Sequence, residues 1–150
     1  MESIRPMKLV PCGLQLMTLD SLFPGGKSFH TYRRLTWTGE VNPMDGTRIY
    51  RLRLTYVLGR PPRVFVLEPD LRVLSGGKRI PHLYSQETQW LCLYRPGMGL
   101  WNPGMFLSQT IVPWALTWLI FFELWLATGA WHGRAYGHPG DNPNQLIERF

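Results

Sequence analysis

The sequence YRLRLTYVL, residues 50–58, alternates apolar and polar side chains over its whole length. Its apolar side chains share one face: Tyr50, Leu52, Leu54, Tyr56 and Leu58. Arg51, Arg53 and Thr55 share the other face. A period of two residues is typical of a β-strand with one face buried and one face in water. The segment therefore predicts a strand of a sheet, with its arginines on the solvent face.

Strands of the same kind are predicted on both sides of this one. TYRRLTWTGEV, residues 31–41, is joined to it by the turn sequence NPMDGT at 42–47, and RVFVLEP, residues 63–69, follows the turn sequence GRPP at 59–62. Short connections of this kind join antiparallel neighbours. With the short extended segment TQWLCLY at residues 88–94, the pattern predicts a four-stranded antiparallel meander.

Residues 1–30 predict one short helix. The segment LQLMTLDSLF at residues 14–23 brings Leu14, Met17 and Leu22 near one helical face, and the following Pro-Gly-Gly ends the helix. At the other end of the chain, residues 132–150 are rich in glycine and proline and predict an irregular C-terminal arm. The whole chain of 150 residues has the length of a single domain, 1–150.

A 21-residue apolar segment, residues 111–131, has two interpretations. It is long enough to cross a membrane, which makes a small membrane-associated protein one alternative. Against a span, Pro113 lies near its start and Glu123 lies inside it, and a charge at mid-span costs about 3 kcal/mol on insertion scales. We favour a long central helix packed on the sheet, which makes the fold class α+β.

Composition excludes several classes of function. Two cysteines do not form a disulfide framework, which favours reduced thiols and a cytoplasmic location. The four histidines and two cysteines have no zinc-ligand spacing, and no phosphate-binding loop is present, so we expect neither metal nor cofactor. The net charge of +6 is concentrated between Arg48 and Arg79, with eight basic and two acidic residues. These charges could form a nucleic-acid surface, but their alternation with apolar residues favours the solvent face of the sheet.

The segment PHLYSQETQWLCLYRP, residues 81–96, carries the chemistry. His82 lies ten positions before Cys92, and Trp101 lies nine positions after it in the loop RPGMGLWNPG. Cys92 is either a small buried hydrophobic residue at a strand end or a nucleophile. Cys12 has no comparable context and is expected to be structural.

The order of these features resembles the ubiquitin-conjugating enzyme (UBC) fold, in which a His-Pro-Asn motif precedes the thioester cysteine, with its histidine ten positions upstream. The sequence is more similar to the short conjugating-enzyme-like proteins of bacterial CBASS anti-phage systems. That likeness covers about residues 30–139 and includes the aromatic helix and the segment HGRAYGHP at 132–139. One departure is clear: the His-Pro-Asn motif reads His82-Leu83-Tyr84 here.

The resemblance implies a UBC-like arrangement and a transferase. Cys92 would carry the C-terminus of a cGAS/DncV-like nucleotidyltransferase as a thioester and pass it to a target protein. A separate enzyme would activate the acyl group, or Cys92 would attack a peptide bond directly. The missing asparagine leaves a non-catalytic adaptor as an alternative, and a homodimer stays open.

The same resemblance implies roles for four further residues. His82 would act as a base, lower the pKa of Cys92 or brace the loop. Tyr84 occupies the asparagine position, where its hydroxyl would donate to an oxyanion or its ring would pack. Trp101 would anchor the loop after the cysteine. His138 would act as a base if the C-terminal arm folds back over Cys92, and otherwise is a surface histidine.

Overall fold

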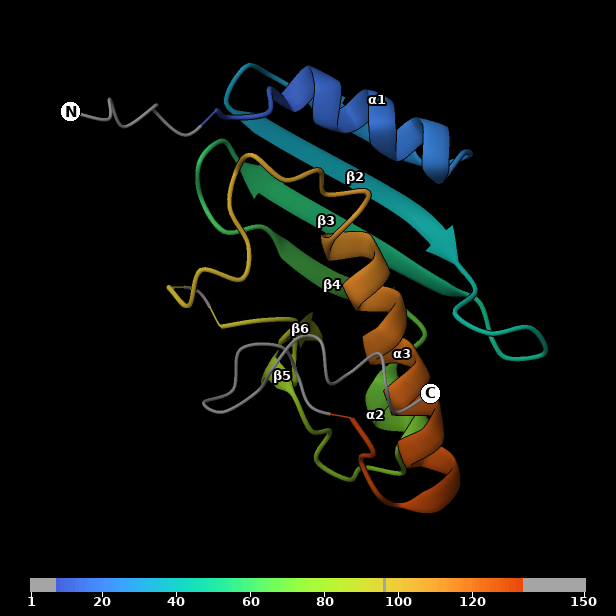
Figure 1. Ribbon diagram of the computed structural model, residues 1–150. Coiled ribbons are helices and arrows are strands. Elements are labelled where there is room, and N and C mark those ends of the chain that lie inside the picture. Colours follow the sequence, from blue (N-terminus) through green and yellow to red (C-terminus); the bar gives the residue numbers. More distant parts are fainter. Residues whose placement is uncertain (1–7, 96, 134–150) are drawn as a thin grey trace.

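The computed structural model describes residues 8–95 and 97–133 as an α+β fold of six antiparallel strands and three helices (Figure 1). The elements in chain order are α1 (Cys12–Leu22), β1 (Lys27–His30), β2 (Arg34–Val41), β3 (Tyr50–Val57), β4 (Arg63–Glu68), α2 (Leu71–Leu74), β5 (Leu83–Ser85), β6 (Trp90–Leu91) and α3 (Ile111–Thr128). The strand order in the sheet is β1-β2-β3-β4-β6-β5. The α+β class predicted from sequence is confirmed.

The three central strands follow the period-two pattern. In β3 the residues with buried and exposed side chains alternate from Tyr50 onward, and Arg51 and Arg53 lie on the exposed face as predicted. Leu54 pairs with Trp37 of β2 on one side and Val64 of β4 on the other, and all three are buried. Cross-strand apolar neighbours of this kind stabilise a sheet on its core face.

The sheet has six strands, so the prediction of four was wrong. β1 was missed because all four of its residues are exposed: an edge strand paired only with β2 has no buried face to give it a period. β5 was missed because it has only three residues and is defined by its pairing with β6, which includes a register shift. Both strands are too short for the two-residue alternation of apolar and polar side chains to repeat more than once or twice.

The N-terminal helix is present, but the helical face named from sequence is the wrong one to bury. Leu14, Met17 and Leu22 are exposed, whereas the buried residues are Cys12, Gln15 and Leu19. Apolar residues occur on both sides of α1, so hydrophobicity alone does not select the core face. The side chain of Gln15 helps to decide it, because its amide donates to the Met105 carbonyl at 2.9 Å and accepts from the Leu107 amide at 2.9 Å.

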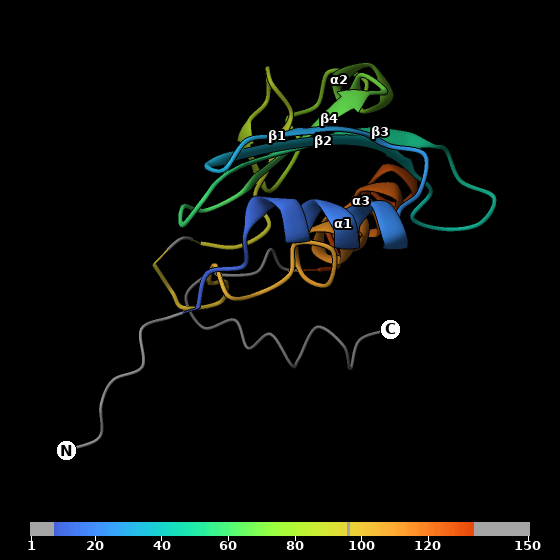
Figure 2. The same ribbon diagram turned by 90° about the horizontal axis from the view of Figure 1, so that it is seen from above.

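Helix α3 lies across the same face of the sheet as α1 (Figures 1 and 2). It ends at Thr128, three residues before the end of the predicted apolar segment, and is capped by Gly129, which has a left-handed backbone (φ 77°). By length and composition the helix could cross a membrane, and 44% of its residues are buried within the protein. Its buried residues join those of the sheet in one core.

The charge inside this apolar helix has partners on the sheet. The carboxylate of Glu123 accepts a hydrogen bond from Arg48 Nη1 at 2.7 Å and another from the hydroxyl of Tyr50, a fully buried residue. These contacts tie the second half of α3 to the start of β3. Glu123 is therefore a link between helix and sheet, which accounts for a carboxylate at this position in a core helix.

Candidate active site

His82 and Cys92 face one another across a hairpin formed by β5 and β6. Leu83 pairs with Leu91, and beyond that pair the Cys92 amide donates to the His82 carbonyl at 3.0 Å. The ten positions between His82 and Cys92 are thus the length of chain that runs along β5, turns and returns along β6. The polar residues 86–89 form its turn.

The backbone of His82 is held in an unusual conformation. Its φ is 55°, in the left-handed region, which costs a non-glycine residue about 1–2 kcal/mol. Its carbonyl accepts a second hydrogen bond, from Trp118 Nε1 of α3 at 2.9 Å. The imidazole lies against Trp131, with ring centroids 5.2 Å apart. His82 therefore joins the hairpin to the central helix.

Cys92 is partly exposed, directly after β6. Burial raises the pKa of its thiol above the usual cysteine value, while a hydrogen bond with the Tyr84 side chain and the charge of Arg95 act in the opposite direction. The net shift is upward. The thiolate needed for nucleophilic attack is consequently dependent on these two neighbours and on the removal of the thiol proton.

The hydroxyl of Tyr84 is a polar neighbour of the Cys92 thiol. This hydroxyl donates to the Tyr94 carbonyl at 2.8 Å and is also within hydrogen-bonding reach of Cys92. Burial, and then its hydrogen bond with Cys92, raises the pKa of this phenol above its usual range. It therefore remains protonated at neutral pH and has one hydrogen, which it can give either to the Tyr94 carbonyl or to a negatively charged sulfur.

Aromatic and cationic side chains support Tyr84 from the outer side. Its ring packs on Trp90 with centroids 4.7 Å apart, and the guanidinium carbon of Arg63 lies 4.7 Å from the Trp90 ring centroid. Contacts of a cation with an aromatic face are attractive by about 1 kcal/mol at exposed sites. The three side chains come from β4, β5 and β6, so the position of Tyr84 depends on the paired strands.

Two glutamines that sequence reasoning missed hold the chain on either side of this hairpin. Gln86 accepts from the Ile80 amide at 3.0 Å and donates to the Ile80 carbonyl at 2.7 Å. Gln89 accepts from the Leu71 amide at 2.6 Å and donates to the Val66 carbonyl at 2.7 Å. A long amide side chain can satisfy both groups of an irregular backbone. The signal in the sequence that could have identified these two glutamines is the run of polar residues 85–89 directly before an apolar strand.

The loop after the cysteine is fixed by Trp101. Trp101 is almost fully buried. Its Nε1 donates to Thr110 Oγ1 at 3.2 Å, and its ring packs edge to face on Tyr56 with centroids 5.7 Å apart. These contacts join the loop to β3 and to the residue preceding α3. His138, the other predicted site residue, lies outside the described residues, as does most of the predicted C-terminal arm.

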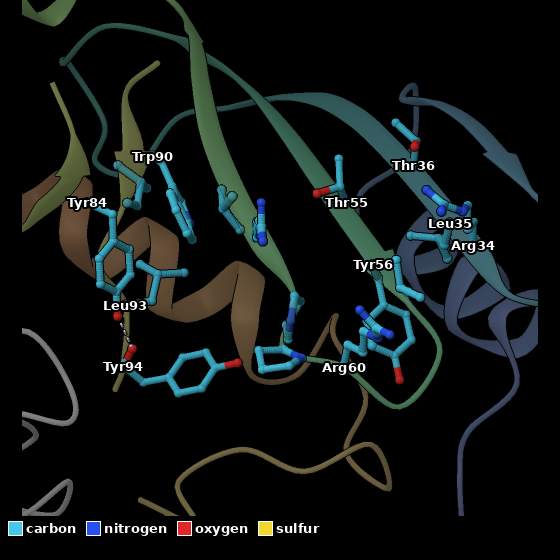
Figure 3. A pocket seen from close by; sticks show the side chains of 16 residues that line it. Arg34, Leu35, Thr36, Thr55, Tyr56, Arg60, Tyr84, Trp90, Leu93 and Tyr94 are labelled. Atoms are coloured by element: carbon cyan, nitrogen blue, oxygen red, sulfur yellow. Dashed lines mark hydrogen bonds between the residues drawn. The ribbon is translucent and has the colours of Figure 1, made fainter. Parts of the chain in front are cut away.

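A pocket of about 660 Å³ adjoins the hairpin (Figure 3). Tyr84 and Tyr94 line one side of it, and Arg34 and Tyr56 line the other. The two leucines that flank Cys92 in the chain, Leu91 and Leu93, also line it. The candidate nucleophile thus lies beside a concave surface large enough for part of a substrate.

Comparison with known proteins supplies the family. No curated protein matches the chain. A family model described as type II CBASS E2 protein matches residues 15–139, more than four fifths of the chain. The matched region contains all six strands, the His82–Cys92 hairpin and the whole of α3. The chain therefore belongs to the type II CBASS E2 family, the conjugating-enzyme-like proteins of CBASS antiviral defence.

Proposed function

We propose that this protein is a cysteine transferase that carries the C-terminus of a cGAS/DncV-like nucleotidyltransferase as a thioester on Cys92. It then passes this acyl group to an amine or thiol of a target protein, in the cytoplasm. The fold would be the UBC-like arrangement that the resemblance implies. The observation that carries the proposal is a partly exposed Cys92 thiol with the protonated hydroxyl of Tyr84 as a neighbour that acts to lower its pKa.

Loading forms one bond and breaks another. The Cys92 sulfur loses its proton and attacks the acyl carbon, and the group previously attached to that carbon leaves with the bonding electrons. This leaving group is an adenylate if a separate enzyme activates the acyl group, or an amine if Cys92 attacks a peptide bond directly. A cysteine suits both because its thiolate is a strong nucleophile and later a good leaving group.

Tyr84 has a role in each half of the reaction. Before attack, its hydroxyl donates to the thiolate and lowers the cost of removing the proton. In transfer, the acceptor amine attacks the thioester carbon, the carbon–sulfur bond breaks, and the same hydroxyl stabilises the departing thiolate. In this proposal the hydroxyl also donates to the oxyanion of the tetrahedral intermediate, the role that the resemblance gives to the family's asparagine.

His82 acts in this proposal as a brace. Its carbonyl holds the Cys92 amide and the Trp118 indole, and its ring packs on Trp131. These contacts position the hairpin and leave the deprotonation of Cys92 to another base. His138 stays a candidate for that base.

One observation favours the second candidate function, a non-catalytic adaptor. The pKa of Cys92 is raised overall, whereas an activated cysteine usually has a lowered pKa. In this alternative Cys92 is a packing residue and the protein only holds its partners together. The two functions differ in whether a covalent adduct forms at Cys92.

The test uses the purified chain with the nucleotidyltransferase of the same system, ATP and a lysate of cells that carry the whole system, which supplies any separate activating enzyme. Wild-type protein should form an adduct that hydroxylamine and thiols cleave, because thioesters are labile to both. Cys92→Ser should convert it into an adduct that resists thiols, and Cys92→Ala should remove it with little loss of volume. Cys12→Ala is the matched control and should retain the labile adduct. An adduct of undiminished yield in Cys92→Ala would exclude the thioester, and its absence from all variants would favour the adaptor.

A further inference from the structure

The pocket beside the Cys92 hairpin has the size of a ligand site. Its volume of about 660 Å³ lies within the roughly 300–1,000 Å³ that such sites occupy. It lies between the ends of the central strands and the Tyr84–Tyr94 side of the hairpin (Figure 3). The function proposed above uses the hairpin but assigns nothing to this pocket.

The charges around the pocket are of one sign. Arg34, Arg60 and Arg63 line it, and no acidic side chain does so among the described residues. Arg63 lies over Trp90, but Arg34 and Arg60 are exposed and have no carboxylate partner in the described part of the chain. The hydroxyls of Thr36 and Thr55 add neutral hydrogen-bonding groups. Such a surface attracts a carboxylate or another anion.

Tyr94 adds a second, independent observation. Tyr94 is only 6% exposed, yet its hydroxyl has no hydrogen-bond partner among the described residues. In Figure 3 its ring extends from below Tyr84 toward Arg60, so that the hydroxyl points toward the side of the pocket that Arg60 lines. A buried hydroxyl without a partner costs free energy. A ligand that accepts its hydrogen would recover this free energy.

The pocket is continuous with the site of thioester formation. Tyr84 lines it, and its hydroxyl is the neighbour that acts to lower the pKa of the Cys92 thiol. Leu91 and Leu93 line it on either side of Cys92 in the chain. An acyl group held on the Cys92 sulfur must place the residues that precede it along a neighbouring surface, and this pocket is a concave surface that shares Tyr84 with the site.

We propose that the pocket binds an acidic peptide segment of the protein carried on Cys92, the segment that directly precedes the acyl carbon. Carboxylate side chains of that segment pair with Arg34 and Arg60, and a carbonyl or carboxylate oxygen accepts the hydrogen of Tyr94. This inference rests on the proposed function and specifies its substrate. The same positive charge disfavours a protonated lysine, so the acceptor amine approaches Cys92 from another side.

The test measures binding without the covalent step. The probe is the fluorescein-labelled peptide Ala-Glu-Leu-Glu-Ala-Gly with a C-terminal amide, and its twin has glutamine at both glutamate positions. Both are titrated into the full chain carrying Cys92→Ala, and binding is followed by fluorescence anisotropy. The glutamate peptide should bind roughly tenfold or more tightly than its twin, because charge-assisted hydrogen bonds contribute about 1.5–3 kcal/mol.

Matched variants locate the effect. Arg34→Ser with Arg60→Ser should weaken binding of the glutamate peptide by roughly tenfold or more. The control, Arg72→Ser with Arg79→Ser, removes the same charge from exposed positions outside the pocket and should leave binding unchanged. Tyr94→Phe should weaken binding several-fold while its melting temperature stays equal or rises, since a hydroxyl with no protein partner is removed.

Three results would overturn the inference. They are equal affinity for the two peptides, unchanged binding by the Arg34 and Arg60 variant, or displacement of the peptide by inorganic phosphate or ATP at concentrations below that of competing unlabelled peptide. The last would identify a site for a free phosphate compound. Failure here is separable from failure of the proposed function, because wild-type protein would still form the thiol-labile adduct at Cys92, and the adduct would form equally fast in the Arg34 and Arg60 variant.

Discussion

The amide of Cys92 donates a hydrogen bond to the carbonyl of His82 at 3.0 Å, so the candidate nucleophile and the histidine ten positions before it are joined through their backbones. The His82 carbonyl is shared with Trp118 Nε1 of α3, at 2.9 Å. The pair therefore connects the edge hairpin, the central helix and the reactive sulfur. Its first consequence is that the backbone and the ring of His82 can be tested separately.

His82→Gly and His82→Ala should behave differently. Glycine adopts the observed φ of 55° without the cost of about 1–2 kcal/mol that alanine keeps, and both lose the packing on Trp131. If His82 is a brace, both variants lower the melting temperature, alanine more than glycine, and the fall in loading rate is the same at all pH values. A loss of loading greatest at acidic pH, with melting temperature unchanged, would instead identify His82 as a base.

Tyr84→Phe should raise the pKa of Cys92. The hydrogen bond from Tyr84 stabilises the thiolate and so lowers the thiol pKa; without it, the midpoint for alkylation by iodoacetamide should move to higher pH. A hydrogen bond to a charged group contributes about 1.5–3 kcal/mol, so the move of the midpoint to higher pH should be measurable.

The ring of Tyr84 supplies the control for this experiment. Phenylalanine keeps the packing on Trp90, so the melting temperature of Tyr84→Phe should change little. Tyr32→Phe removes a hydroxyl from an exposed tyrosine and should leave the alkylation midpoint unchanged. A midpoint that does not move in Tyr84→Phe would show that the hydroxyl does not act on the thiol.

Glu123→Leu should destabilise the fold more than Glu123→Gln. Glutamine loses the ion pair with Arg48, which is 40% exposed at its side chain and contributes about 0–1 kcal/mol, but can still accept from Tyr50. Leucine leaves the buried Tyr50 hydroxyl without its acceptor, at a cost of about 1–3 kcal/mol. Urea unfolding measures both. A leucine variant as stable as wild type would mean that Glu123 does not fasten α3 to the sheet.

Gln89→Leu should destabilise the hairpin that carries Cys92. It removes hydrogen bonds to Leu71, Val66 and Pro69 and leaves buried backbone groups unsatisfied, so we expect a loss of about 2–4 kcal/mol in the free energy of unfolding. Loading at Cys92 should slow in parallel. Gln109→Leu is the matched control at an exposed position and should change stability by about 0.5 kcal/mol or less. Equal effects of the two substitutions would contradict the bracing role.

Sequence alone was sufficient where a residue's environment follows from its near neighbours. The alternation of Tyr50, Leu52 and Leu54 with two arginines predicted β3 and its solvent face, and the same period predicted β2 and β4. A long apolar segment predicted α3. The spacing of His82 and Cys92, together with the resemblance to CBASS conjugating-enzyme-like proteins, predicted the type II CBASS E2 family that the family model then matched. Each of these signals is carried by residues within one element or one hairpin.

Tertiary structure decided what depends on residues far apart in the chain. β1 and β5 exist because a neighbouring strand pairs with them, and α1 buries Gln15 instead of Leu14 because the loop at Met105 and Leu107 needs its amide. Glu123 finds its partners 73 and 75 positions away. The pocket likewise draws its arginines and Tyr94 from separate strands and loops. Such contacts are selected by the free energy of satisfying buried polar groups and filling one core, and no local period in the sequence records that free energy.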